Sequence, residues 1–397
     1  VMVKMGDSAT TLADAKGRLI SEAASVFRTG TLMSTLDGAI AKFGGAFRQG
    51  DIVLVNDPYS GMGHMPDCAI IAPVFWRNEL VAFTPVYSHH TDIGGRFPGG
   101  FSSSSRETYE EGLRIPPVKL YEAGKRNDAT VDIISANVRN PEEWFGDIEA
   151  KIAGCRNGAA QMCALLDKYG LAVYTATCDY LQQHTERATR AAIRTIPHGT
   201  YSIENYFEED GLGTLDVRLP VRISLRAEGD ELTIDLTGSA PQAKGAINVP
   251  LGMTKGAIYG AVRAIIGRDL IINSGLVRPL KIVIPEGSIF NPRFPAATGG
   301  RASLFFHLMD SIFRCLAKAL PQKVGVLGEA GDLIHFSGLT ADHRFESFID
   351  SFAGGWGGRP NKDGIDAVYP VSFGTVGSTP VELLEREHPV VVESFGI

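Results

Sequence analysis

The spacing of hydrophobic and polar positions changes twice along the chain and divides it into three regions. In residues 1–139, short apolar runs at Ile52–Val55 and Leu80–Phe83 predict buried strands. Asp14–Gly17 predicts a turn between strands, and Met33–Phe43 has the apolar spacing of a helix. The glycine-rich loops here are long, and Arg96–Arg106 has no period. Such loops in a compact domain are usually functional or disordered, and their close-set His, Asp and Arg residues favour function.

Residues 140–198 have the period of two long helices. Asn140 is a good N-cap, and Pro141 suits the first helical position. Gly170 can end the first helix in the left-handed conformation. A second helix is predicted from about Ala172 to Ile196. We expect the two helices to form a long helical hairpin in the middle of the chain.

Residues 199–397 change to a period of two. Val221–Leu225 and Leu232–Leu236 alternate apolar with polar residues around a turn at Glu228–Asp230, which predicts a β-hairpin with one buried face. We further predict a helix at Met253–Ile266, a strand at Leu280–Ile284, a loop at Gly354–Gly358 and an unfinished strand at Val390–Ile397. The pattern indicates a mixed α/β and α+β fold with antiparallel or mixed sheets, in a fragment truncated at its C-terminal side.

Composition narrows the class of protein. The 397 residues are 44% hydrophobic and 21% charged, as in an ordinary globular chain. A net charge of −7 gives no electrostatic footprint for nucleic acid or an anionic membrane, and apolar runs such as Cys68–Trp76 are too short to span a bilayer. The five cysteines form no CxxC motif, so we expect reduced cysteines in a cytoplasmic protein.

The most informative polar residues are His64 and Asp67, followed after one strand pair by His89, His90 and Asp92. Two imidazoles and one carboxylate are a common set for a divalent transition metal. If the strand at 80–83 runs antiparallel to or beside one at 68–74, the two loops meet at one edge of a sheet. Three protein ligands would leave a coordination position for water or substrate. The alternative is that these histidines are simply packed or exposed.

Other polar residues leave two interpretations open. Asp57 follows a strand directly, in an Asn-Asp-Pro-Tyr sequence that suits a plain turn or a site loop. Arg106, Arg114 and Lys119 either bind a phosphate or carboxylate or are solvated and paired. No Walker A loop and no GxSxG motif occurs, so we expect any nucleotide to be handled by another chain or by additional sequence.

Several motifs together resemble the hydantoinase B/oxoprolinase family. The resemblance begins with Asn56–Tyr59, His64–Asp67 and His89–Gly95. It continues in order through Glu111–Lys119, Asn137–Arg139, Gly146–Asp147, Gly238–Gln242, Asn273–Gly275, Pro285–Ser288 and Gly357–Gly364. It therefore covers nearly the whole chain.

The resemblance implies a partner and a metal. Members work with a larger ATP-binding partner of the hydantoinase A type, which carries ATP and Mg²⁺ and phosphorylates the carbonyl oxygen of a cyclic amide or ketone. In metal-bearing relatives the ligands of a divalent Zn, Mn or Fe ion map onto His64, Asp67 and His89. A further acidic ligand is expected near the start of the chain, at a position where many members have Glu and this sequence has Lys4. Asp7 is the nearby acidic residue that could take its place.

The function expected from the resemblance is the catalytic component of an ATP-dependent cyclic amide hydrolase of the 5-oxoprolinase or hydantoinase type. Asp92 and Asp57 are expected as a general base or as partners of the ligands, and Arg114 and His90 as substrate-binding groups. One alternative is a subunit of an ATP-dependent ketone carboxylase, because Arg96–Phe101 is similar to the acetone and acetophenone carboxylases. Another is a non-catalytic scaffold subunit. A lactam, hydantoin or ketone would be the substrate.

Overall fold

The first sheet has seven strands. The computed structural model describes residues 7–23, 27–267, 269–325, 332–340, 342–369 and 379–394. The strands are β1 (Ser8–Asp14), β2 (Leu19–Ala23), β3 (Ile52–Val55), β4 (Asp67–Trp76), β5 (Glu79–His89), β6 (Val118–Glu122) and β7 (Lys125–Arg126). They lie in the order β2-β1-β5-β4-β3-β6-β7, and every neighbouring pair is antiparallel. The strands at 68–74 and 80–83, which are expected from the sequence to lie side by side or antiparallel, are antiparallel neighbours.

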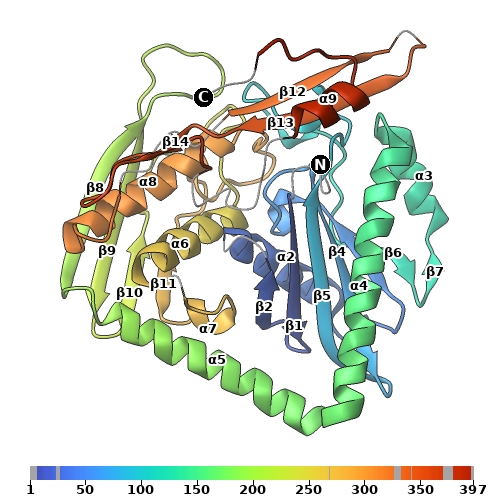
Figure 1. The fold of residues 1–397 in the computed structure, drawn as a ribbon, viewed down its shortest axis with the longest axis horizontal. Helices are drawn as coiled ribbons and strands as arrows, with labels where there is room; N and C mark the ends of the chain where they lie inside the picture. Colours follow the sequence, from blue (N-terminus) through green and yellow to red (C-terminus); the bar gives the residue numbers. More distant parts are fainter. Residues whose placement is uncertain are drawn as a thin grey trace.

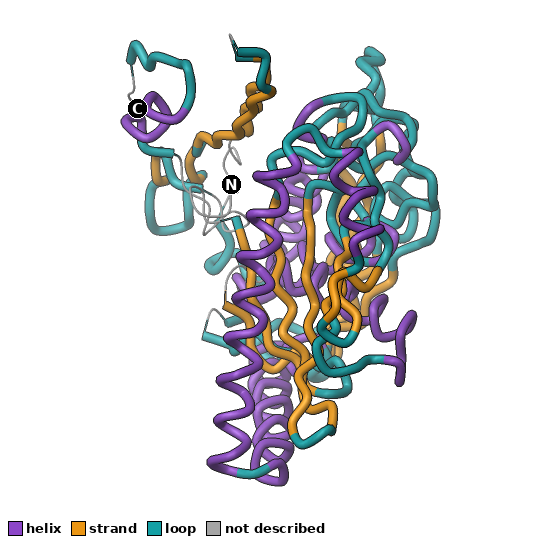
Figure 2. The backbone as a smooth tube through the Cα atoms, turned by 90° about the vertical axis from the view of Figure 1, so that its right-hand side faces the viewer, coloured by secondary structure: helices purple, strands orange, loops and turns teal. Residues whose placement is uncertain are grey.

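Helices cover both faces of this sheet. The predicted helix at 33–43 is the second half of α2 (Phe27–Phe43), whose Leu32 and Leu36 pack with strand residues on one face. The opposite face is covered by α4 (Pro141–Tyr169), and α3 (Asp128–Asn137) packs against α4. Figure 2 shows long helices in front of the strands on this side. Asn140 caps α4 as predicted, because its side chain accepts a hydrogen bond from the Glu143 amide.

The two long helices do not form the expected hairpin. The second helix, α5 (Leu171–Ile193), follows α4 after Gly170 alone. Gly170 has φ 80° and ψ 158°, a positive φ with an extended ψ instead of the predicted left-handed helical conformation. The helices therefore diverge at a corner, and α5 crosses to the other half of the molecule (Figure 1). The helix α4 packs on β4 and β5 of the first sheet, whereas α5 packs mainly on the short helix α7 (Ser274–Val277), so contacts between the two helices are few.

The second sheet contains four strands, β8 (Gly199–Phe207), β9 (Leu219–Glu228), β10 (Glu231–Asp235) and β11 (Leu280–Val283). Their order is β11-β10-β9-β8, and β10 and β11 are parallel, so the sheet is mixed. The predicted hairpin is confirmed, since β9 and β10 pair antiparallel around Gly229. Between the two sheets lie α2, α6 (Leu251–Ile266) and α8 (Ala302–Ala319), with α2 against α6, α6 against α8 and α8 against β8 and β9.

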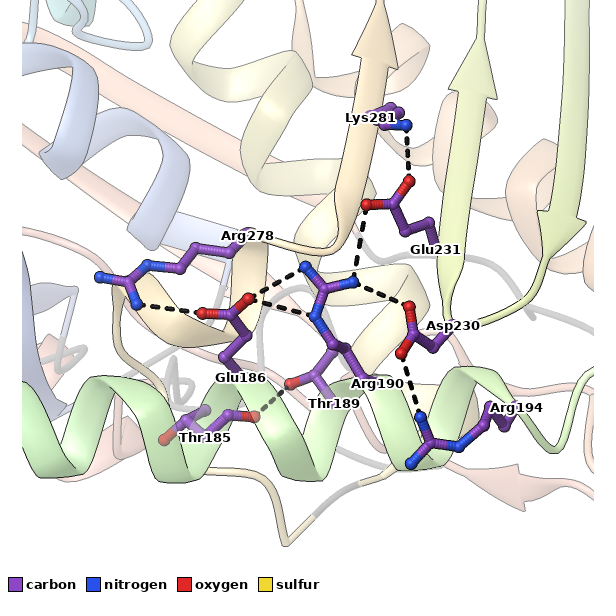
Figure 3. Close-up of polar contacts among 9 residues, drawn as sticks. All are labelled: Thr185, Glu186, Thr189, Arg190, Arg194, Asp230, Glu231, Arg278 and Lys281. Carbon is purple, nitrogen blue, oxygen red and sulfur yellow. Dashed lines mark hydrogen bonds and ion pairs between the residues drawn. The ribbon is translucent and has the colours of Figure 1, made fainter.

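Charged residues fix α5 to the second sheet (Figure 3). The Arg190 guanidinium lies 2.9 Å from a carboxylate oxygen of Glu186 and 2.9 Å from one of Asp230, at the β9–β10 turn. Arg278, after the short helix α7 (Ser274–Val277), donates to Glu186 at 3.0 Å. These contacts join three segments that are far apart in sequence and attach the C-terminal end of α5 to the second half.

The C-terminal part forms small units at the top of Figure 1. They are β12 (Asp332–Leu339), β13 (Phe345–Phe352), β14 (Gly355–Trp356), β15 (Ile365–Asp366) and α9 (Val381–Glu387). The predicted loop at Gly354–Gly358 therefore contains a two-residue strand. The predicted terminal strand is absent from the described residues 390–394. In the described part of the chain, no helix combines the length and apolar character that a membrane crossing requires.

The mixed α/β fold expected from the sequence is confirmed. Short 3-10 turns interrupt its long loops at Gly44–Ala46, Pro58–Ser60, Pro98–Gly100 and Thr108–Glu110.

Candidate metal centre

Strand register brings His64, Asp67 and His89 together. Asp67 begins β4, His89 ends β5, and the two residues are directly paired in the antiparallel ladder. His64 lies three residues before β4, in the loop that leads into it. One ligand atom from each of the three side chains falls within 4.8 Å of the others. All three side chains are buried, so the sheet holds a preformed group of two imidazoles and one carboxylate.

The imidazoles have hydrogen-bonding capacity that no neighbouring side chain uses. Both ring nitrogens of His64 and of His89 are buried and make no hydrogen bond in the described structure. His64 Nε2 lies 3.0 Å from Asp67 Oδ1, but without the direction of a hydrogen bond. Buried polar atoms are nearly always satisfied, and a metal ion would satisfy one nitrogen of each ring. The residues therefore fit a divalent metal with three protein ligands.

Burial also sets suitable protonation states. It lowers the pKa of His64 to about 4 and the pKa of His89 well below its ordinary value. Burial alone would raise the pKa of Asp67, but the adjacent His64 and the positive charge of Arg301 bring it well below its usual range. At neutral pH the site holds neutral imidazoles beside an ionised carboxylate, and these are the forms that bind a metal.

Two further side chains contact Asp67. The Tyr87 hydroxyl donates to Asp67 Oδ1 at 2.7 Å, and Arg301 Nη2 lies 3.4 Å from Oδ2. Burial raises the pKa of Tyr87 well above its ordinary value, so the hydroxyl stays a donor. Sequence reasoning missed both residues. Tyr87 could have been found by strand alternation, since it is two residues before His89, but Arg301 lies 234 residues from Asp67 and carries no local signal.

These residues border a cavity of about 100 Å³ between the two halves of the molecule. Its polar lining includes Asp7, Arg28, His64, Asp67, Tyr87, His89 and Arg301. Its apolar lining includes Phe27, Phe101, Met253, Phe305 and Phe306. Phe101 stacks on the His89 ring with 5.1 Å between centroids and 15° between planes. The aperiodic loop at 96–106 therefore contributes directly to this cavity.

Asp57 and Arg114 lie outside the cavity lining. Asp57 accepts hydrogen bonds from the Tyr59 amide and the Ser60 hydroxyl, so it stabilises the turn that follows β3. Arg114 lies 3.3 Å from Asp57 and over the ring of Phe294. The structure thus favours the turn interpretation of Asp57 and a paired Arg114.

His90 and Asp92 are also separated from the three candidate ligands. Successive strand residues face opposite sides of a sheet, and His90 lies on the α4 side, with Nε2 2.6 Å from Lys151 Nζ. Asp92 accepts hydrogen bonds from the Gly94 and Arg139 amides and pairs with the Arg139 guanidinium at 2.8 Å. Neither residue lines the cavity, so the structure does not support the expected roles at the metal.

The expected fourth acidic position, Lys4, lies outside the described residues. Asp7, the substitute considered from the sequence, does line the cavity. Its carboxylate pairs with Arg28 and is not part of the close group of three. Among the described lining residues, Asp7 and Asp67 are the acidic ones.

Comparison with known proteins places this fold and these residues in a family. The chain is 35% identical over 361 residues to a putative D-/L-hydantoinase component of the B type from Pseudomonas sp. (strain NS671), a match that covers 88% of this chain and 60% of the relative. It is 30% identical over 375 residues to the beta chain of caprolactamase from Pseudomonas jessenii, covering 93% of this chain and 64% of the relative. The chain thus spans about 60% of the length of these relatives.

Solved structures have the same fold. The crystal structure of ATP-dependent caprolactamase from Pseudomonas jessenii matches with a TM-score of 0.91 at 28% identity, covering 99% of this chain and 69% of that one. A nucleotide-free acetone carboxylase matches with a TM-score of 0.89 at 17% identity, covering 98% and 55%, and this likeness shows the fold alone. The sequence model described as Hydantoinase B/oxoprolinase matches residues 1–397, so the chain belongs to the hydantoinase B/oxoprolinase family.

Proposed function

We propose that this chain is the hydrolytic component of an ATP-dependent cyclic amide hydrolase and holds a divalent metal at His64, Asp67 and His89. The observation that carries the proposal is the buried group of three ligand atoms within 4.8 Å, in which both imidazoles lack hydrogen-bond partners. The names of two relatives, one a component of a hydantoinase and the other of a caprolactamase, support a cyclic amide as the substrate.

The chemistry assigned to the chain is addition of water to an activated carbonyl. A metal of the Zn, Mn or Fe type would supply Lewis acidity and lower the pKa of a water at its open position. The water oxygen would bond to the carbonyl carbon, the ring C–N bond would break with the nitrogen taking a proton, and a second water would release the phosphoryl group from the carboxyl oxygen as phosphate. Among the described lining residues, Asp7 is the acidic one outside the ligand group, so we assign it the proton-accepting position. Phe101 restricts water access to His89.

ATP and Mg²⁺ belong, in this proposal, to a partner of the hydantoinase A type that activates the carbonyl oxygen. The names of the relatives, which describe single components of larger enzymes, and the ATP dependence of the matching caprolactamase support this division. Overall, a lactam, ATP and two waters would give an amino acid, ADP and phosphate. The partner's activation step and the chain's hydrolysis step can therefore be measured separately.

The test combines metal analysis with turnover in the assembly of this chain and its partner. We expect about one metal per chain, and we expect His64→Ala and His89→Ala to lose the metal and at least 100-fold in turnover. His184→Ala, at an exposed position on α5, should retain both. Metal-free wild-type protein with full turnover would refute the proposal. Intact chemistry with weakened assembly in His64→Ala would instead identify a scaffold.

A ketone carboxylase is the second candidate. The observation that favours it is that Phe101, in the loop similar to the acetone and acetophenone carboxylases, contacts both candidate histidine ligands. Bicarbonate-dependent consumption of a ketone without lactam hydrolysis would select this function.

A further inference from the structure

Arg301 places a buried positive charge beside the candidate metal ligands. Its side chain is 8% exposed and borders the cavity. Its contacts to oxygen are long: Nη2 lies 3.4 Å from Asp67 Oδ2 and Nη1 lies 3.5 Å from the Gly299 carbonyl. Nε lies 3.2 Å from the Met253 sulfur, which is a weak acceptor. A guanidinium carries five N–H donors, and bonds to anionic oxygens are usually about 2.7–2.9 Å long. The Arg301 guanidinium could therefore form shorter hydrogen bonds to an anion bound in the cavity.

Three helices also begin at this cavity. Its lining includes Phe27 and Arg28 at the start of α2, Met253 in the first turn of α6 and Ala302 at the start of α8. Each helix is 16 to 18 residues long, and the first residues of α6 and α8 have no side-chain cap. Helix N-termini carry partial positive charge and unpaired amide donors. Their partial charges add to the positive electrostatic potential that Arg301 creates in the cavity.

Both carboxylates among the described cavity residues already have partners. Asp7 pairs with Arg28. Asp67 directs Oδ1 toward His64 and Tyr87, and Oδ2 toward Arg301. A metal at Oδ1 would neutralise much of the carboxylate charge and weaken its hold on Arg301. The same event would therefore prepare Arg301 for another anion.

We propose that Arg301 and the converging helix starts form a subsite for a substrate oxyanion, a phosphoryl or carboxylate group, and that metal and anion binding strengthen each other. The coupling rests on the metal site of the proposed function, whereas the anion subsite does not depend on any reaction. The subsite replaces Arg114, which the sequence favoured, because Arg301 is buried in the cavity and Arg114 is not.

Anion binding to the purified protein tests the subsite directly. Methylphosphonate serves as the phosphoryl probe and acetate as the carboxylate probe, each titrated by calorimetry without metal. We expect Arg301→Gln to weaken binding of the preferred anion by at least about tenfold, and Arg301→Lys to retain part of it, since lysine keeps the charge but loses the planar fork. Arg114→Gln is the matched control and should bind as wild type does.

The coupling is measured in wild-type protein with Co²⁺ as the metal probe. We expect saturating anion to tighten Co²⁺ binding by about fivefold or more, and Co²⁺ to tighten anion binding by the same factor. The subsite proposal is overturned if folded Arg301→Gln binds the anion as tightly as wild type, or if Arg114→Gln loses anion binding. It is also overturned if wild type binds neither anion. If Arg301→Gln does not fold, Arg301→Lys with wild-type affinity decides against it.

These outcomes separate the two proposals. If wild-type protein binds methylphosphonate but no Co²⁺, the metal site and the coupling are both refuted. Anion binding by the Arg301 variants still tests the subsite in that case. Co²⁺ binding that is indifferent to both anions refutes the coupling alone.

Discussion

Glu111 is a buried carboxylate that connects the loop after residue 106 to the start of α8. Its Oε1 accepts hydrogen bonds from the Thr298 amide at 2.8 Å and the Gly299 amide at 2.5 Å. Burial raises the pKa of Glu111 to about 7, although both amide bonds oppose the rise. The carboxyl group therefore holds the segment that leads into Arg301 and titrates near neutral pH.

The raised pKa of Glu111 predicts a pH-dependent contribution to stability. Because the folded-state pKa lies above the unfolded value, the folded protein binds more protons between about pH 4.5 and 7. The stability that protonated Glu111 contributes is fully present below about pH 4.5. It is lost as the pH rises to about 7, and the loss in the free energy of unfolding is up to about 3 kcal/mol. Glu111→Gln keeps an acceptor oxygen and removes the titration.

Urea unfolding of wild type and Glu111→Gln at pH 5, 6, 7 and 8 measures this effect. The stability of wild type minus that of the variant should fall by about 3 kcal/mol from pH 5 to pH 8, and other titrating groups cancel in the difference. A difference that rises with pH would contradict the assigned sign.

At the scale of single residues, the sequence predicted the candidate ligand group but not its surroundings. His64, Asp67 and His89 were named through the resemblance to metal-bearing relatives, and the structure brings them together because their motifs flank two strands that pair. The flanking residues His90 and Asp92 belong to the same motif, and only the observed faces and pairing partners separate them from His89. Arg301 could not be found, since its proximity depends on how the two halves pack.

At the scale of elements, α2 and α6 approach each other through glycines. A Cβ added at Gly256 would overlap the Phe27 carbonyl oxygen, and one added at Gly30 would overlap the Gly256 amide nitrogen. The backbones are therefore in direct contact where α2 begins to line the cavity. Neither helix can retreat freely, because α2 also packs on the first sheet and α6 on α8.

Gly256→Ala is expected to destabilise the protein by at least about 1–3 kcal/mol, as overpacking of a close contact does. Gly154→Ala is the matched control, since a Cβ there meets nothing within 4 Å at an exposed position in α4. Alanine is the better helix former by about 1 kcal/mol, so the control should be neutral or stabilising. Chemical denaturation of both variants checks this, and equal effects would refute the close-contact argument.

The sequence predicted elements well where their signals are local. Asn140 and Pro141 marked the start of α4, and Gly229 marked the turn of a hairpin, because caps and turns depend on neighbouring residues. The predicted hairpin of α4 and α5 was wrong because the angle between two helices depends on residues far away in the sequence. Gly170 marks the end of a helix, but the direction of the next helix depends on its contacts with distant segments such as α7.

At the scale of the whole molecule, the candidate site depends on how two halves pack against each other. The three candidate ligands belong to the first sheet and the loop before β4, whereas Arg301 is the N-cap residue of α8, a helix packed on the second sheet. Each half has hydrophobic clusters of its own, but Leu32 and Leu36 of α2 pack in the first half while Phe27 of the same helix packs into the core of the second. Because one helix contributes to both cores, we expect one cooperative unfolding transition.

Metal binding should then stabilise the whole molecule. At a free Co²⁺ concentration about 100 times the Kd, linkage adds about 2.7 kcal/mol, which corresponds to a rise of about 3 °C in Tm for a chain of this size. Calorimetry with Co²⁺ or with a chelator should show a single transition that shifts in wild type and stays fixed in His64→Ala. Two transitions, of which Co²⁺ shifts one, would show that the halves unfold separately, because a ligand stabilises only the cooperative unit that contains its site.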